Sequence, residues 1–224
     1  MRGLQRYAAA GGLILLGLAT GCATESQQTL ATESVATYQT NYSGPRYRLV
    51  IGQFANTSPY MRGIFSDGTD QLGGQAKTIL KTHLSQTGRF PLVDRDNMDA
   101  LARESQISGA GQDLIGAELV VTGEVTEFGR RTTGDKQLFG IAGRGKTQTA
   151  YSKVSLNVVN VRTSEVVHSV QGAGEFELSN REVLGTGGTA GYDSTLNGKV
   201  LNLSITDAVN KLVNDLERGL WSPQ

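Results

Sequence analysis

The sequence predicts an α/β fold in which a mixed β-sheet is packed by helices within a single domain. Some segments alternate apolar and polar residues, which indicates strands, and others place apolar residues every three or four positions, which indicates helices. The two kinds of segment are interleaved along the chain. With 224 residues, the chain is long enough for one domain with a sizeable core.

The first strand is predicted over residues 47–54, and an amphipathic helix follows it. His83 shares the apolar face of this helix, so it is predicted to be a core or boundary residue, and Gly88 ends the helix. The face contains Leu72, Ala76, Ile79, Leu80, His83 and Leu84. A short strand is then predicted over residues 90–93, where Pro91 favours an edge or a strand start.

A second helix is predicted from about Asp96, with Met98, Leu101 and Ala102 facing inward. The strand pattern returns over residues 119–128, where Leu119, Val121 and Val125 share one face.

Residues 151–161 and 166–170 alternate on either side of a short polar turn and predict a β-hairpin, with His168 on its solvated face. A periodic helix over residues 203–216, closed by Gly219, ends the fold.

Two glycine-rich excursions, residues 129–149 and 172–199, interrupt these elements. Segments of this length within a compact domain are functional or mobile. Apolar residues are few in both segments, and the first carries six charged side chains.

The N-terminus has the features of a lipoprotein signal peptide. Arg2 and Arg6 precede a short apolar run, and small residues lead to Cys22, the only cysteine of the chain. We therefore expect residues 1–21 to be removed and Cys22 to be acylated. The alternatives are an ordinary secretory peptide followed by a chance cysteine, or a buried structural thiol. Ala23 follows the cysteine where an Asp is associated with inner-membrane retention, so the outer membrane is the expected location.

Residues 22–45 are rich in Thr, Ser, Gln and Glu and are predicted to form a flexible tether, with docking on a neighbour as a second possibility. The folded domain is predicted over residues 46–221. Without residues 1–21 the net charge is −2, so no basic surface for nucleic acid is expected. The lone cysteine leaves no disulfide framework or zinc site, and no cofactor is expected.

Residues 140–147 read Gly-Ile-Ala-Gly-Arg-Gly-Lys-Thr, the spacing of a phosphate-binding loop. Such a loop needs a buried strand before it and a helix that begins at its lysine. The preceding residues are polar and the following ones alternate as in a strand, so nucleotide binding is not predicted. His83 and His168 also lack metal-ligand spacing, and we expect no enzymatic activity.

Three stretches resemble the CsgG/HfaB family of outer-membrane lipoproteins, which contains curli-type secretion pores and holdfast-assembly proteins. The stretch 90–95 resembles the family's strand-to-helix junction, 158–167 its hairpin, and 216–221 the end of its terminal helix. The resemblance covers about residues 46–221 and implies a homo-oligomer. It also implies that the two excursions are β-hairpins that span the membrane on oligomerisation.

In the curli pore, a loop after the first strand forms the channel constriction. The resemblance places Tyr60, Ile64 and Phe65 at the constriction positions, where repeated aromatic rings would grip an unfolded chain. The alternative is that Tyr60 and Phe65 anchor a surface loop to the core.

The resemblance implies an outer-membrane lipoprotein, facing the periplasm, that assists the secretion or assembly of curli-like fibres or adhesins. Its partners would be the outer membrane and the exported subunits. The alternative is a non-pore periplasmic lipoprotein that binds and regulates another envelope protein, for example a peptidoglycan synthase activator.

Overall fold

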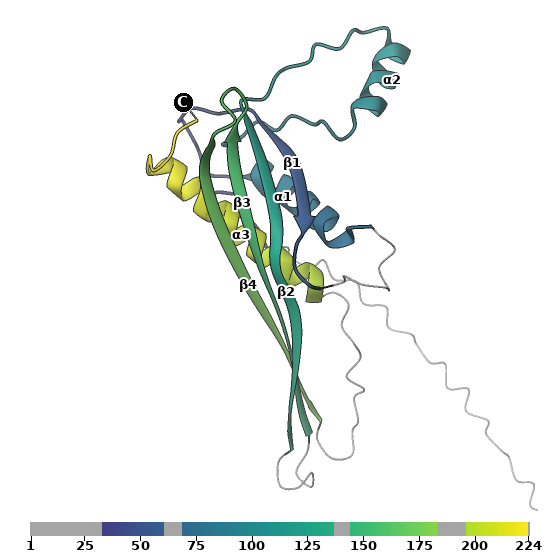
Figure 1. The fold of residues 1–224 in the computed structure, drawn as a ribbon, viewed down its shortest axis with the longest axis vertical. Coiled ribbons are helices and arrows are strands. Elements are labelled where there is room, and N and C mark those ends of the chain that lie inside the picture. Colours follow the sequence, from purple (N-terminus) through teal and green to yellow (C-terminus); the bar gives the residue numbers. More distant parts are fainter. Residues whose placement is uncertain (1–32, 61–68, 137–143, 183–195, 224) are drawn as a thin grey trace, which may run out of the picture. The chain divides into compact units, whose positions relative to one another are not determined.

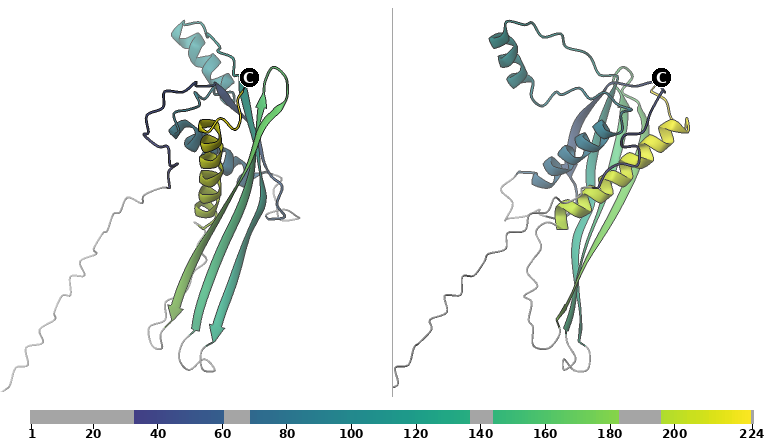
Figure 2. Two further views of the ribbon diagram at one scale, coloured as in Figure 1. Left: turned by 90° about the vertical axis from the view of Figure 1, so that its left-hand side faces the viewer. Right: turned by 180° about the vertical axis from the view of Figure 1, so that it is seen from behind.

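The computed structural model describes residues 33–60, 69–136, 144–182 and 196–223. Within this part, four strands form one sheet in the order β1-β2-β3-β4. Figure 1 and Figure 2 show helices α1 and α3 together on one face of the sheet. The elements are β1 (Leu49–Asn56), α1 (Gln71–Gln86), α2 (Met98–Ser108), β2 (Leu119–Lys136), β3 (Arg144–Asn160), β4 (Val166–Glu182) and α3 (Leu196–Glu217).

The sheet is mixed, as the sequence predicts. β1 pairs with β2 in parallel, from Leu49 opposite Leu119 to Asn56 opposite Val125. β2 pairs with β3, and β3 with β4, in antiparallel orientation. The predicted hairpin over residues 151–170 is confirmed as the start of β4 paired with the end of β3.

The core lies between the sheet and the two helices. Fully buried residues come from the inner face of the strands and from one side of each helix: Leu49, Leu80, Leu84, Leu119, Val121, Leu156, Ile205 and Leu212. The N-cap of α1 is Asp70, whose Oδ1 accepts a hydrogen bond from the Gly73 amide at 2.8 Å. This is the usual capping of a helix N-terminus by a short acidic side chain.

α2 differs from the prediction. It extends away from the sheet (Figure 1), and none of its residues is buried. Leu101 is 44% exposed and Ile107 is 78% exposed. The amphipathic pattern therefore identified a helix correctly but not its surroundings, so the predicted inward face of α2 is wrong.

The predicted strand over residues 90–93 is reduced to a single parallel bridge between Leu92 and Leu49. His83 is buried, and its Nε2 lies 2.8 Å from Asn202 Oδ1 on α3, so its prediction as a core residue is confirmed. His168 is not on a solvated face. Its ring stacks on Trp221, and its Nε2 lies 3.0 Å from Asp215 Oδ2.

Residues 33–45 differ from the tether predicted over residues 22–45. They lie against the domain, with Val35 only 2% exposed and within the hydrophobic core. The sequence did not predict this docking because the segment is mostly polar, and Val35 is a single aliphatic residue within it. Among the helices of the described residues, none combines the length and the hydropathy that a membrane span requires.

Candidate functional site

The candidate site is a three-stranded extension of the sheet. Residues 129–136, 144–151 and 175–182 stay in continuous antiparallel register, and we call them the distal ribbon. Figure 1 and Figure 2 show the ribbon continuing past the N-terminal end of α3. At about 3.3 Å per residue, its eight residues per strand extend roughly 26 Å. The predicted glycine-rich excursions thus contribute long strands to the main sheet.

Polar side chains dominate the described part of the distal ribbon. Arg131, Thr132 and Thr133 of β2 are exposed, and so are Glu175 and Glu177 of β4. The central strand contributes Gln148 and Thr149, which are 8% and 6% exposed. The register opposes Arg131 to Thr149 and Thr149 to Glu177, so one row of the ribbon carries charges of both signs.

Within the residues that the structure describes, neither edge of the distal ribbon is paired with a further strand. In the described residues, β1 ends at Asn56, opposite Val125, and β2 from Glu127 onward pairs only with β3. β4 likewise pairs only with β3 in this part of the chain. An open strand edge presents a row of backbone N–H and C=O groups that can pair with another chain. The ribbon is therefore suited to recognition by strand addition.

The ribbon is fixed to the domain at its base by Tyr60. The centroids of the Tyr60 ring and the Phe128 ring of β2 are 4.6 Å apart, and the two ring planes are tilted by 50°. Its hydroxyl accepts a hydrogen bond from Asn197 Nδ2 at 3.1 Å. Asn197 Oδ1 in turn accepts one from Arg130 Nε at 2.8 Å. This chain of contacts joins the segment after β1, the start of α3 and the base of the ribbon.

A second contact holds the base from the β4 side. Lys199 Nζ of α3 lies 5.0 Å from the centre of the Phe176 ring, within the range of a cation–π interaction. Lys199 is exposed, so the contact is of the weaker, solvated kind. The first turns of α3 therefore contact both outer strands of the ribbon at its base.

Two glycines of β4 set how closely α3 approaches the sheet. A Cβ at Gly172 would overlap the Ser204 carbonyl oxygen and lie 2.5 Å from the Ala208 nitrogen. A Cβ at Gly174 would lie 2.8 Å from the Ser204 nitrogen and 2.9 Å from the Val200 carbonyl oxygen. These glycines of the second excursion thus permit tight helix–strand packing, a role glycine serves where another backbone approaches.

Of the predicted site residues, only Tyr60 lies within the described residues. Cys22, Ile64 and Phe65 lie outside them. Tyr60 uses both its ring and its hydroxyl in contacts with the domain. Sequence reasoning missed Arg130 and Asn197, because polar residues at the start of a helix and within a polar strand carry no periodic signal.

The phosphate-loop motif does not have the surroundings it needs. β3 begins at Arg144, so Lys146 and Thr147 lie in a strand where a phosphate loop requires a helix. Among the described residues, no three or more His, Cys, Asp or Glu side chains are grouped so that they could hold a metal ion.

Comparison with known proteins gives a family match over nearly the whole chain. The model of the family described as curli production assembly/transport component CsgG matches residues 31–224. A protein of Neisseria meningitidis serogroup B, named as a candidate lipoprotein, is 61% identical over 204 residues, which cover 91% of this chain and 92% of the relative. The curli production assembly/transport component CsgG of Escherichia coli K12 is 27% identical over 202 residues, covering 77% and 70%.

Among solved structures, the C-terminal domain of LpoB from Escherichia coli is 17% identical. The match covers 57% of this chain and 81% of that chain, with a TM-score of 0.31.

Proposed function

We propose a function from one established premise, that the chain belongs to the CsgG family. In this proposal the protein is an envelope lipoprotein of the CsgG type that works as an oligomer. It assists the secretion or assembly of curli-like fibre subunits or adhesins, and it performs no catalytic step.

The observation that carries the proposal is the distal ribbon, whose two edges have no further strand paired to them among the described residues. A head-to-tail contact between the β2 edge of one copy and the β4 side of the next uses two different surfaces, and such contacts form a ring when the rotation between copies closes. Pairing would satisfy the backbone groups that both edges leave open. The mixed charges of Arg131, Glu175 and Glu177 suit the wall of an aqueous passage for an unfolded chain.

Tyr60 has a supporting role in this proposal. Its contacts with Phe128 and Asn197 fix the start of the segment that continues to Ile64 and Phe65. Tyr60 is thus the anchor of the proposed constriction, and Phe65 is the aromatic residue proposed to contact the exported chain.

Acylated Cys22 would attach each copy to the outer membrane, with the domain on the periplasmic side. The support for this is the signal-peptide pattern of residues 1–22 and the 61% identical relative, which is named as a candidate lipoprotein. Radioactive palmitate incorporated into the natural protein, but not into Cys22→Ser, would test the attachment.

A second candidate is a non-pore lipoprotein that binds and regulates another envelope protein. It is favoured by a different observation, the polarity of the distal ribbon. Arg131, Thr132 and Thr133 are consecutive and exposed, so they place polar side chains on both faces of β2. A strand that faces lipid needs apolar side chains at alternate positions.

Disulfide trapping between copies tests the oligomer. We pair Arg131→Cys or Thr133→Cys on β2 with Glu175→Cys or Glu177→Cys on β4, so that four combinations sample the register. Within one chain β3 separates these positions by two strand spacings, about 9.6 Å, which exceeds the reach of a disulfide. Oxidised membranes should therefore give a ladder of dimers and larger species by non-reducing electrophoresis.

The matched control is the exposed pair Arg103→Cys and Glu165→Cys, which lies outside the distal ribbon and should stay monomeric. Planar bilayers containing the purified protein should show discrete conductance steps. Monomers in all four combinations, together with silent bilayers, would reject the oligomer and support the regulatory candidate.

A further inference from the structure

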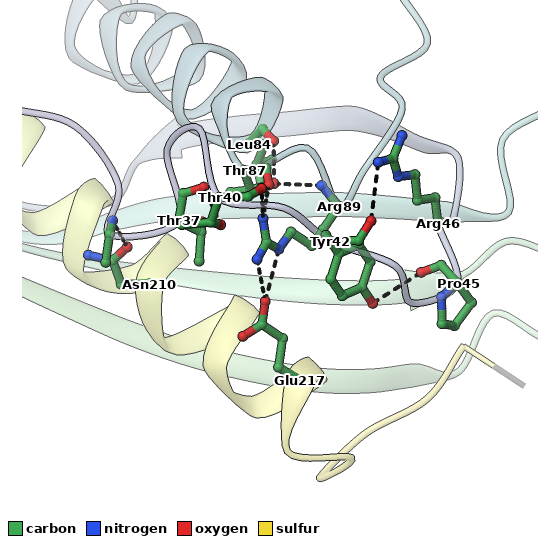
Figure 3. Close-up of polar contacts among 11 residues, drawn as sticks. Thr37, Thr40, Tyr42, Pro45, Arg46, Leu84, Thr87, Arg89, Asn210 and Glu217 are labelled. Carbon is green, nitrogen blue, oxygen red and sulfur yellow. Dashed lines mark hydrogen bonds and ion pairs between the residues drawn. The ribbon is translucent and has the colours of Figure 1, made fainter.

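The N-terminal strap, which we define as residues 33–45, is held to the domain around a buried arginine. Arg89 comes three residues after the last residue of α1, Gln86, and directly after Gly88, which adopts φ +66° and turns the chain back. The Arg89 side chain is only 4% exposed in its ion pair with Glu217, the last residue of α3. Figure 3 shows Arg89 between the strap and Glu217.

Arg89 divides its hydrogen bonds between the domain and the strap. Nε and Nη2 donate to Glu217 Oε1 at 2.9 and 2.6 Å, and Nη1 donates to the Thr87 carbonyl at 2.5 Å. Nη1 also reaches the carbonyl of Thr40 in the strap at 3.4 Å, and the Tyr42 ring lies 4.7 Å from the guanidinium carbon. Burial is the main reason why the pKa of Tyr42 is raised, with the Glu217 charge adding to it.

The strap can therefore leave without stranding a buried charge. Its departure removes the Thr40 carbonyl and the Tyr42 ring, whereas Glu217 and the Thr87 carbonyl still satisfy Arg89. Among the described residues, two further attachments hold the strap. Val35 is buried, and the Ala36 amide donates to Asn210 Oδ1 on α3 at 2.9 Å.

Two features of the docked strap oppose docking. The Thr37 hydroxyl is buried with no hydrogen-bond partner in the described structure, although water would satisfy it on release. Gln39 adopts φ +58°, a left-handed conformation that is costly for a residue with a side chain. Few contacts and two local penalties mark a segment that opens without unfolding the domain.

We propose that the strap is a releasable clamp that sets how far the anchored domain can stand from the membrane. This inference rests on the lipid anchor of the proposed function. With the strap docked, Glu33 is 11 residue steps along the chain from Cys22; with the strap released, Arg46 is 24 steps from Cys22. At about 3.5 Å per residue, the longest possible span rises from roughly 38 Å to roughly 84 Å.

Hydrogen exchange of the full acylated protein in lipid vesicles tests the clamp. We expect the amides of Ala36, Tyr38 and Thr40, each of which donates a hydrogen bond in the docked strap, to be protected in the natural protein. Tyr42→Leu and Asn210→Leu should each raise exchange across residues 33–45 by roughly tenfold while the sheet stays protected.

The clamp can also be tightened. Thr37→Val keeps the shape of the side chain and removes the unpartnered hydroxyl, so exchange in the strap should slow by several-fold. Arg218→Gln is the matched control beside Glu217, because Arg218 is exposed, and it should leave exchange unchanged.

Energy transfer measures the reach itself. Acylation occupies the only native thiol, so a donor on Arg162→Cys is uniquely placed, and the acceptors are dye-labelled lipids. Transfer should fall in Tyr42→Leu and Asn210→Leu and rise in Thr37→Val.

Three results would overturn the clamp: exchange of residues 33–45 at free-peptide rates in the natural protein, opposing variants that behave alike, or altered exchange with unaltered transfer. Failure of the natural protein to bind vesicles would remove both the reach function and the lipid anchor. Monomers in the disulfide experiment would reject the oligomer alone.

Discussion

Gly172 and Gly174 lie in β4 at the point where α3 crosses it. Neither has a positive φ, so their role is the absence of a side chain and not a turn. The Ser204 hydroxyl, buried at the same crossing, donates to the Leu201 carbonyl at 3.0 Å and lies 3.0 Å from the Ser152 hydroxyl of β3. The glycines have no side chain and the Ser204 hydroxyl is hydrogen-bonded within the crossing, so there is little room for a larger side chain at either glycine.

Gly172→Ala should destabilise the protein because its Cβ would overlap backbone atoms of α3, which cannot move independently of the helix. Overpacking of this kind costs at least about 2 kcal/mol, which lowers the Tm of a chain of this length by roughly 4 °C or more. Scanning calorimetry measures the change. Gly116→Ala is the matched control, since nothing lies within 4 Å of its added Cβ; an equal loss in both variants would contradict the crossing argument.

At the scale of elements, Asp94 organises the junction between the residue 90–93 segment and α2. Its carboxylate accepts hydrogen bonds from Asn97 Nδ2 at 2.8 Å, Lys81 Nζ at 3.0 Å and the Asp96 amide at 2.9 Å. These bonds, led by that from Asn97, hold the pKa of Asp94 well below its ordinary value. They link α1 to the start of α2, which has no buried residue of its own.

The lowered pKa of Asp94 predicts a dependence of stability on pH. A carboxyl whose folded pKa is depressed contributes stability above its unfolded pKa, and the contribution is lost as the pH falls. Asp94→Asn should therefore lower the Tm at pH 7, and the difference from the natural protein should begin to shrink below about pH 4 and keep shrinking down to pH 2. Thermal scans from pH 7 to pH 2 measure this. Asp113→Asn, in an exposed loop, should show no such pattern, and parallel curves for Asp94→Asn would contradict the assignment.

The sequence predicted the elements whose periodicity arises from burial on one side. α1, α3 and the inner face of β2 and β3 are of this kind, and their apolar residues lie in the core as expected. The same pattern misled for α2, because periodicity shows that a helix is amphipathic and does not show what covers it. Polar segments gave the weakest predictions, since strand pairing in the distal ribbon uses backbone groups that every residue carries.

The contacts of the candidate site were less predictable than the fold, because they join residues that are far apart in the sequence. Tyr60 was identified from the resemblance, and its contacts with Phe128 and Asn197 join residues far apart in the chain. Arg89 and Glu217 are likewise 128 residues apart, and no local sequence pattern predicts the ion pair between them.

At the scale of the whole domain, the sheet has two regions that differ in whether helices cover them. α1 and α3 cover the proximal strands, whereas the distal ribbon extends past α3 (Figure 2). Backbone hydrogen bonds without a covering core open readily, and core strands open only with global unfolding.

Hydrogen exchange should therefore distinguish free from assembled protein. In dilute detergent, amides of residues 129–136 should exchange much faster than those of residues 119–125 of the same strand. In membranes that give the disulfide ladder, residues 129–136 should become protected by roughly tenfold or more, because a neighbouring copy pairs with the edge. Equal protection along β2 in both states would contradict edge pairing.

The irregularity in β2 between Val125 and Glu127 has a consequence for every side chain beyond it. Side chains alternate between faces with a period of two, so one extra residue at this point reverses which side each later residue takes. The even-numbered Phe128 is therefore buried after the odd-numbered Val121 and Val125, and deletion of one β2 residue beyond the irregularity should exchange the faces of the later β2 side chains while those of β3 and β4 stay where they are.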